Sequence, residues 1–178
     1  MVPEIIDVLL CATLVIALVI DLKTRRIPNA LTLPAMLLGV LFAASWKEAA
    51  MRAGLVVLVL GSGYLFFAVG IIGAGDVKLA AAVASLKGWD FLVATLIGAA
   101  IVGLFVAIFA LAKQGDLVPF VRRIGNAVGD VAFRGIAPAP ILGAEKQTIP
   151  YAVVLAGGAF LALVGEYRHI TPLQLFQP

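Results

Sequence analysis

Two long stretches without any charged residue constrain most strongly what this chain can fold into. Ala53 to Ile72 and Phe91 to Ala112 are each about as long as the roughly 20 residues that a helix needs to cross about 30 Å of hydrocarbon. Ile5 to Ile20, Ala30 to Trp46 and Ile149 to Gly165 are shorter apolar segments that are still suited to crossing. The pattern predicts transmembrane helices.

A sixth apolar segment, Val77 to Leu86, is too short to cross a bilayer unaided. We therefore expect it to be tilted, placed in thinned bilayer, or partly sheltered by protein. The chain is 63% hydrophobic and 13% charged, and its 18 glycines suit closely packed helices better than a β-barrel. We expect a single all-α membrane domain over residues 1–178, with about six transmembrane helices of which the fourth is short.

The basic residues predict the orientation of the chain. Alternating the six spans places nine of them on one side and four on the other, and the richer side is expected to be cytoplasmic. The nine are Lys23, Arg25, Arg26, Lys78, Lys113, Arg122, Arg123, Arg134 and Lys146; the four are Lys47, Arg52, Lys87 and Arg168. The N-terminus then lies outside, and Trp46 and Trp89 both fall at the outer interface.

The N-terminal apolar run is expected to remain as a permanent first span. No Lys or Arg precedes Lys23, so the run lacks the basic start of a cleaved signal peptide. The small formal net charge of +3 gives no indication of nucleic-acid binding. The lipid bilayer is the partner that the composition itself implies.

The longest polar segment is the loop of residues 113–147, on the predicted cytoplasmic side. Within it, apolar residues recur at a spacing of three to four, which is typical of one helix face: Leu117, Val121, Ile124, Val128 and Val131. We expect a cytoplasmic amphipathic helix lying on the inner leaflet, with an ordinary connector as the alternative.

Two aspartates stand where apolar spans meet the predicted cytoplasmic side. Asp21 closes the first span and Asp76 follows the third, and a carboxylate at such a position is costly. One interpretation is structural: Asp21 is an interfacial charge beside Lys23 and Arg25, and Asp76 caps a short helix. The other is functional, because the topology brings both carboxylates to the same membrane face at similar depth.

A pair of carboxylates has the chemistry that peptide hydrolysis needs. Two such groups close together cannot both ionise easily, so one can act as a base on water while the other, protonated, polarises a scissile carbonyl. Gly73 and Gly75 precede Asp76 and leave room for an extended substrate backbone. The candidate catalytic residues are therefore Asp21 and Asp76.

Two segments around these aspartates resemble the type IV prepilin peptidases. Residues 73–78, Gly-Ala-Gly-Asp-Val-Lys, are similar to the GxGD signature of intramembrane aspartyl proteases. Residues 21–29, Asp-Leu-Lys-Thr-Arg-Arg-Ile-Pro-Asn, resemble the second aspartate motif of the family. Residues 149–152, Ile-Pro-Tyr-Ala, match the element that opens the family's last helix, so the resemblance covers most of the chain.

The resemblance implies removal of the short basic leader of a prepilin at the cytoplasmic face of a bacterial inner membrane, ahead of the prepilin's hydrophobic helix. Larger members carry a domain with zinc-binding cysteine pairs and also N-methylate the product. This chain has one cysteine, so we expect no methyl transfer and a closer likeness to the peptidases of Flp/Tad-type pilus systems. The residues expected to bind substrate or shape the site are Gly73, Gly75, Lys78, Lys23, Pro28, Asn29, Pro150 and Tyr151.

Other interpretations of these residues stay open. Lys23 and Lys78 also serve as orientation signals, and Pro28 with Asn29 also sets the turn into the second span. Cys11 and His169 are single residues that suggest no metal site, so no cofactor is expected. Rival functions are a small transporter or channel subunit that uses the same aspartates for a cation, and a non-catalytic assembly factor.

Overall fold

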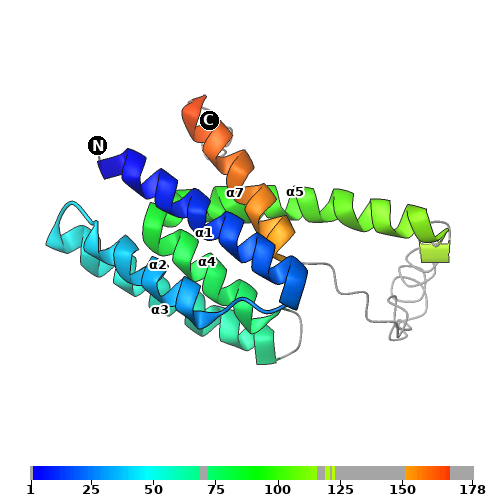
Figure 1. The fold of residues 1–178 in the computed structure, drawn as a ribbon, viewed down its shortest axis with the longest axis horizontal. Helices are drawn as coiled ribbons and strands as arrows, with labels where there is room; N and C mark the ends of the chain where they lie inside the picture. Colours follow the sequence, from blue (N-terminus) through cyan, green and yellow to red (C-terminus); the bar gives the residue numbers. More distant parts are fainter. Residues whose placement is uncertain (1, 69–71, 116–118, 121, 123–150, 169–178) are drawn as a thin grey trace, which may run out of the picture. The chain divides into compact units, whose positions relative to one another are not determined.

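All regular structure in the described part of the chain is α-helical. The computed structural model describes residues 2–68, 72–115, 119, 120, 122 and 151–168. Figure 1 shows the helices, which are α1 (Val2–Thr24), α2 (Asn29–Leu41), α3 (Trp46–Ala68), α4 (Ala74–Lys87), α5 (Trp89–Gln114) and α7 (Tyr151–Tyr167). The expected all-α membrane architecture is confirmed, and each of the six predicted segments corresponds to one of these helices.

Three of the helices are long and apolar enough to cross a membrane. They are α1, counted over Glu4–Thr24, together with α3 and α5. The other apolar helices, α2 and α7, have 13 and 17 residues. The predicted amphipathic helix of the long loop falls on residues outside the described part of the chain.

The second helix ends earlier than the sequence suggested. We expected it to run to Trp46, but α2 ends at Leu41 and Trp46 is the first residue of α3. The cause is a capping motif: the Glu48 N–H donates to Ser45 Oγ at 3.2 Å, and the Glu48 carboxylate accepts from the Ala44 N–H at 2.8 Å. The apolar run continues through this turn, so hydropathy alone did not reveal it.

The chain divides into two compact units. One contains residues 1–102 and 150–178, and the other contains residues 103–149, with the C-terminal part of α5. Helix α5 ends at Gln114 and is followed by Gly115, whose φ of 75° is a left-handed value that glycine adopts without strain. Both candidate aspartates belong to the first unit, which is described below.

Helix α4 lies at the centre of the first unit, packed against both α2 and α3. Its 14 residues span only about 21 Å, yet it is buried over most of the stretch from Val77 to Leu86. Of the three alternatives for this short segment, its burial favours shelter by protein. The neighbouring helices α2 and α3 shelter it.

Close helix crossings make this packing possible. A Cβ built on Gly39 of α2 would lie 2.6 Å from the backbone carbon of Ser85 in α4, so only glycine permits this contact. At the same crossing the Ser85 hydroxyl donates to the Met36 carbonyl at 2.6 Å. A second crossing brings Gly98 of α5 against Gly158 of α7, where a Cβ on Gly98 would lie 2.8 Å from the Gly158 carbonyl oxygen.

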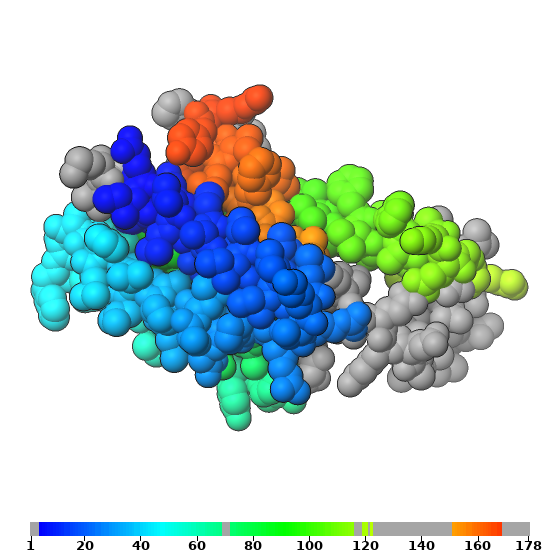
Figure 2. Space-filling model, in the orientation of Figure 1, coloured from blue at the N-terminus to red at the C-terminus, as the bar shows by residue number. Residues whose placement is uncertain are grey.

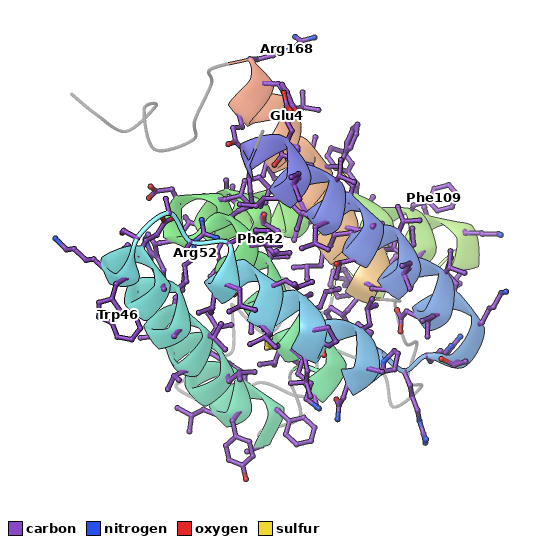
Figure 3. All side chains as sticks on the ribbon, turned by 60° about the vertical axis from the view of Figure 1, so that its left-hand side comes forward. Glu4, Phe42, Trp46, Arg52, Phe109 and Arg168 are labelled. Carbon is purple, nitrogen blue, oxygen red and sulfur yellow. The ribbon has the colours of Figure 1, made fainter. Side chains whose placement is uncertain are left out.

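Arg52 of α3 ties α2, α3 and α4 together (labelled in Figure 3). Its guanidinium donates to the carbonyls of Gly39, Ser85 and Leu86 at 2.9, 3.1 and 2.9 Å. It also pairs with Glu48 at 2.7 Å. The last carbonyls of α4 lack helical partners, and this partly buried arginine donates hydrogen bonds to two of them.

The outer surface of the unit is rich in apolar side chains. Figure 2 shows α1 and α2 side by side on one face, with α7 beside α1. Helix α3 has no buried residue, and Val57 is 70% exposed on it. So large an exposed apolar surface suits contact with lipid.

Candidate active site

Asp21 comes from the last turns of α1, on the face that packs into the bundle. Buried residues Leu10, Leu14 and Ala17 precede it on that face, and Asp21 is itself only 8% exposed. The helix ends just after it, where the Arg25 N–H donates to the Asp21 carbonyl at 2.8 Å and Arg25 takes a φ of 52°. A carboxylate is thus placed at the end of a packed helix.

The exposed basic residues that follow Asp21 do not neutralise it. Lys23 and Arg25 are exposed, whereas Asp21 is buried, and no ion pair within the described ranges involves Asp21. These contacts therefore do not favour the interpretation of Asp21 as an interfacial charge beside its basic neighbours. Its carboxylate faces the protein instead.

Asp76 comes from the first turn of α4, directly after Gly73, the N-cap residue. The Asp76 N–H donates to the Gly73 carbonyl at 3.1 Å, and the Asp76 carboxylate accepts a hydrogen bond from the Gly73 backbone. A Cβ on Gly73 would lie 2.7 Å from Asp76 Oδ2. This carboxylate therefore folds back over the N-cap, and the missing side chain at residue 73 leaves the space that it occupies.

The two carboxylates act on each other electrostatically. Burial, and to a smaller extent the negative charge of Asp21, raises the pKa of Asp76 from 3.8 to about 6. The hydrogen bond from the Gly73 backbone lowers this pKa. Folding therefore makes Asp76 hold its proton more tightly, so its ionisation reduces stability as the pH rises from about 4 through 6. One proton shared between two carboxyl groups is the state that general acid and base catalysis requires.

Other motif residues surround the pair at what we call the carboxylate end, residues 21–29 and 73–78. A Cβ on Gly75 would lie 3.2 Å from Ile27 Cβ, so the start of α4 packs tightly on the loop that follows Asp21. Lys78 donates to the Asn29 side-chain oxygen at 2.8 Å. These contacts bring the two aspartate motifs together although 49 residues separate Asn29 from Lys78.

The remaining expected site residues take less central positions. Pro28 is the N-cap of α2, with φ −72° and ψ 143°, which agrees with its expected part in the turn before that helix. Tyr151 is the first residue of α7 and is exposed. Pro150 lies outside the described residues, so its predicted place in the site stays a prediction.

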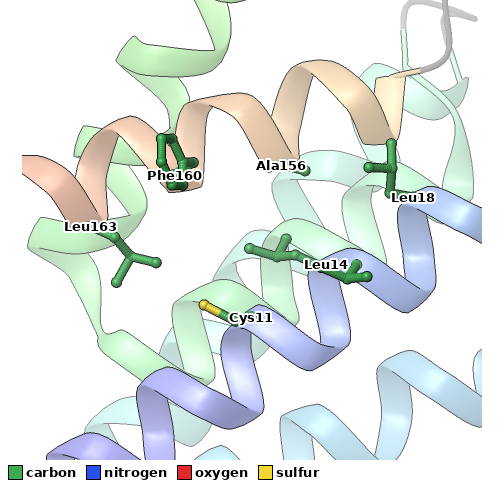
Figure 4. A pocket seen from close by; sticks show the side chains of 7 residues that line it. Cys11, Leu14, Leu18, Ala156, Phe160 and Leu163 are labelled. Atoms are coloured by element: carbon green, nitrogen blue, oxygen red, sulfur yellow. The ribbon is translucent and has the colours of Figure 1, made fainter.

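An apolar groove lies between α1 and α7 (Figure 4). It has a volume of about 130 Å³ and is lined by Cys11, Leu14, Val15, Leu18, Ala156, Phe160 and Leu163. No acidic or basic side chain lines it. The groove is therefore a surface suited to apolar groups.

A second cluster of charges, which we call the lysine end, was missed by the sequence analysis. Lys87 of α4 pairs with Asp7 of α1 at 2.7 Å and with Glu166 of α7 at 2.8 Å. We had treated Lys87 and Arg52 only as charges that flank spans. The signal for Asp7 was present in its spacing from Asp21, since both belong to the buried face of α1.

Comparison with known proteins identifies the family. A family model described as the type IV leader peptidase family matches residues 8–108, a range that includes both aspartates. The chain belongs to the type IV leader peptidase family. The family resemblance expected from the two aspartate motifs is thus confirmed.

Two curated relatives of this leader peptidase family member come from Burkholderia pseudomallei, strains 1026b and K96243. Each is described as a prepilin leader peptidase/N-methyltransferase and is 32% identical over 112 residues, covering 57% of this chain and 36% of the relative. The match thus spans about a third of the length of these relatives. No solved structure matches the chain.

The described residues provide no group suited to holding a metal ion. Within residues 2–68, 72–115, 119, 120, 122 and 151–168, three His, Cys, Asp or Glu side chains nowhere gather as a set of ligands.

Proposed function

We propose that this protein is a membrane aspartyl endopeptidase that removes the short basic leader from type IV prepilins. The observation that carries the proposal is the electrostatic coupling of Asp21 and Asp76 at the carboxylate end. Family membership supports prepilin leader cleavage. The arrangement supports the aspartic type of catalysis, because two carboxyl groups, one buried and one partly buried, interact electrostatically there.

In the proposed mechanism the two aspartates have different roles. Asp76, whose pKa is raised, holds the proton and donates it to the carbonyl oxygen of the scissile peptide. Asp21 accepts a proton from a water molecule as the water oxygen attacks the carbonyl carbon. The tetrahedral diol then collapses: the C–N bond breaks, Asp21 gives its proton to the leaving nitrogen, and Asp76 takes one back from a hydroxyl.

The carboxylate end faces the cytoplasm in this proposal, and the N-terminus lies outside. Exposed basic residues support that side, because Lys23, Arg25 and Arg26 all lie just after Asp21. A prepilin leader is cleaved next to an apolar helix, so the scissile bond would reach the carboxylate end where helices meet the membrane surface. The location we propose is the bacterial inner membrane.

Within this class, a Flp/Tad-type prepilin is the narrower substrate that we propose. This choice rests on the single cysteine of the sequence, which lacks the cysteine pairs of the larger members. Methyl transfer, the second activity in the names of the two relatives, is not part of the proposal. Gly73, Gly75, Lys78, Lys23, Pro28, Asn29, Pro150 and Tyr151 are proposed to bind substrate or shape the site.

Cleavage of a prepilin by the purified protein in detergent tests the proposal. Sequencing the new N-terminus locates the cut, and Asp21→Asn and Asp76→Asn should each reduce turnover by about 10²–10⁴-fold, since an amide cannot exchange the proton. Either variant with wild-type turnover would remove that residue from the mechanism. Absence of cleavage, together with cation flux through the protein in liposomes, would favour the transporter alternative.

A further inference from the structure

The lysine end lies at the opposite ends of α1 and α4 from the aspartate pair. Lys87 Nζ is 2.7 Å from Asp7 Oδ1 and 2.8 Å from Glu166 Oε2, and its side chain is only 10% exposed. The ammonium group also lies 5.2 Å from the centre of the Phe91 ring. These contacts fix the position of the Lys87 ammonium group, whereas the ammonium group of a surface lysine takes many positions.

The charges at both ends lie on the same helix faces. On α1, residues 7, 10, 14, 17 and 21 follow a spacing of three and four, so Asp7 and Asp21 belong to one stripe. Residues between them, Leu10, Leu14 and Ala17, are buried. On α4, residues 76, 80, 83 and 87 form a similar stripe, which begins at Asp76 and ends at Lys87.

The two stripes meet at both ends because the helices run in opposite directions. Asp7 and Asp21 are separated by about 21 Å along α1, and Asp76 and Lys87 by about 16 Å along α4. The long lysine side chain reaches across the difference. One pairing is the electrostatic interaction of Asp21 with Asp76, and the other is the ion pair of Asp7 with Lys87; we call these two pairings the rungs.

Directed contacts hold α4 firmly to α2 and α3, but these contacts do not include α1. Arg52 bonds the carbonyls of Gly39, Ser85 and Leu86, and all of these belong to α2 or α4. Between the two rungs, the stripe of α1 consists of apolar side chains, and apolar burial is not directional. At the carboxylate end, Gly75 of α4 packs on Ile27 in the loop after α1, and at the other end the ion pair of Asp7 with Lys87 joins α1 directly to α4.

We propose that Lys87, through its ion pair with Asp7, is a positioning residue that fixes the axial register of α1 against α4 and so aligns Asp21 with Asp76. The inference rests on the proposed peptidase function. A displacement of α1 along its axis moves the Asp21 carboxylate away from Asp76. Misplacement of a reacting group by about 1 Å costs about 10²-fold in rate.

Two matched variants test this role, because Lys87 has one partner on α1 and another on α7. Asp7→Asn removes the ion pair with the helix that carries Asp21, whereas Glu166→Gln removes the ion pair with a helix that carries neither aspartate. Tyr167 of α7 donates to Asp7 at 3.4 Å, and an asparagine oxygen can still accept this bond. For Asp7→Asn we expect kcat to fall at least about tenfold, with KM within about twofold of the wild type. Glu166→Gln should keep the wild-type kcat.

The pH profile distinguishes positioning from general destabilisation. When Asp21 moves away, the charge that raises the pKa of Asp76 weakens, so the alkaline fall of kcat/KM should move to lower pH in Asp7→Asn. The profile of Glu166→Gln should not move.

Several results would overturn the proposal. Wild-type kcat and pH profile in folded Asp7→Asn would do so, as would equal losses in Asp7→Asn and Glu166→Gln. Where Asp7→Asn does not fold, Asp7→Glu takes its place. Asp7→Glu keeps the charge and shifts the ion pair with Lys87 along the axis of α1 by one methylene. A wild-type kcat in Asp7→Glu would contradict the inference. A wild-type enzyme that does not cleave prepilin defeats the proposed function instead.

Discussion

The contact between Gly73 and Asp76 makes Gly73→Ala a sensitive test of the candidate site. The new Cβ would lie 2.7 Å from Asp76 Oδ2, and ordinary van der Waals contact begins at 3.4 Å. The carboxylate must therefore move by about 0.7 Å, the difference between these values. With about 10²-fold lost per 1 Å of misplacement, we expect kcat to fall by about 10 to 100-fold.

The stability of the same variant should change little. Alanine is a poorer N-cap than glycine, which costs on the order of 1 kcal/mol. Gly61→Ala on α3 is the control, because a Cβ at Gly61 meets nothing within 4 Å. Prepilin cleavage and thermal unfolding, measured in one detergent, separate the two effects.

Two outcomes would refute this reasoning. Gly73→Ala with wild-type kcat would mean that the position of the Asp76 carboxylate does not matter to the reaction. An equal loss of activity in Gly61→Ala would mean that any added methyl group disturbs the enzyme, whatever its distance from the aspartates.

Further predictions concern pH, packing, metal dependence and sidedness. Because burial raises the pKa of Asp76 to about 6 and the reaction uses its protonated form, kcat/KM should fall about tenfold per pH unit above about pH 6; a flat profile from pH 5 to 8 would contradict this. Gly39→Ala should lower stability by about 1–3 kcal/mol in thermal unfolding, because its Cβ would lie 2.6 Å from the backbone of Ser85. Activity should survive strong chelators, and chelator-sensitive cleavage that added metal restores would overturn carboxylate catalysis. A cysteine at Thr24 in a Cys11→Ala background should react with an impermeant thiol reagent only after cells are permeabilised, and labelling in intact cells would reverse the topology.

Local patterns in the sequence predicted the helices and the two aspartates. Hydropathy located each apolar segment, because the bilayer imposes a length on any helix that crosses it. Alternation of the spans then placed Asp21 and Asp76 on one face, and their coupling in the structure agrees with that interpretation. These conclusions needed only the order of residues along the chain.

The features that escaped prediction depend on partners far away in the sequence. Arg52 bonds Leu86, which is 34 residues further along, and Lys87 pairs with Asp7 across 80 residues. A local pattern records the charge of such a residue but not its partner. Helix α2 ended early for a different reason, since the cap at Ser45 interrupts a run that remains apolar.

The roles of Arg52 and Lys87 also bear on the proposed orientation. Of the four basic residues assigned to the outer side, these two have side chains that are only 12% and 10% exposed and are bonded to α4 or paired with acids. They complete the structure of a short buried helix and are not free charges on a loop. The same criterion removes Lys78 of α4, which bonds Asn29, so Lys47 and Arg168 remain against eight on the other side. Because loop charges are what set orientation, the asymmetry that supports a cytoplasmic carboxylate end becomes larger.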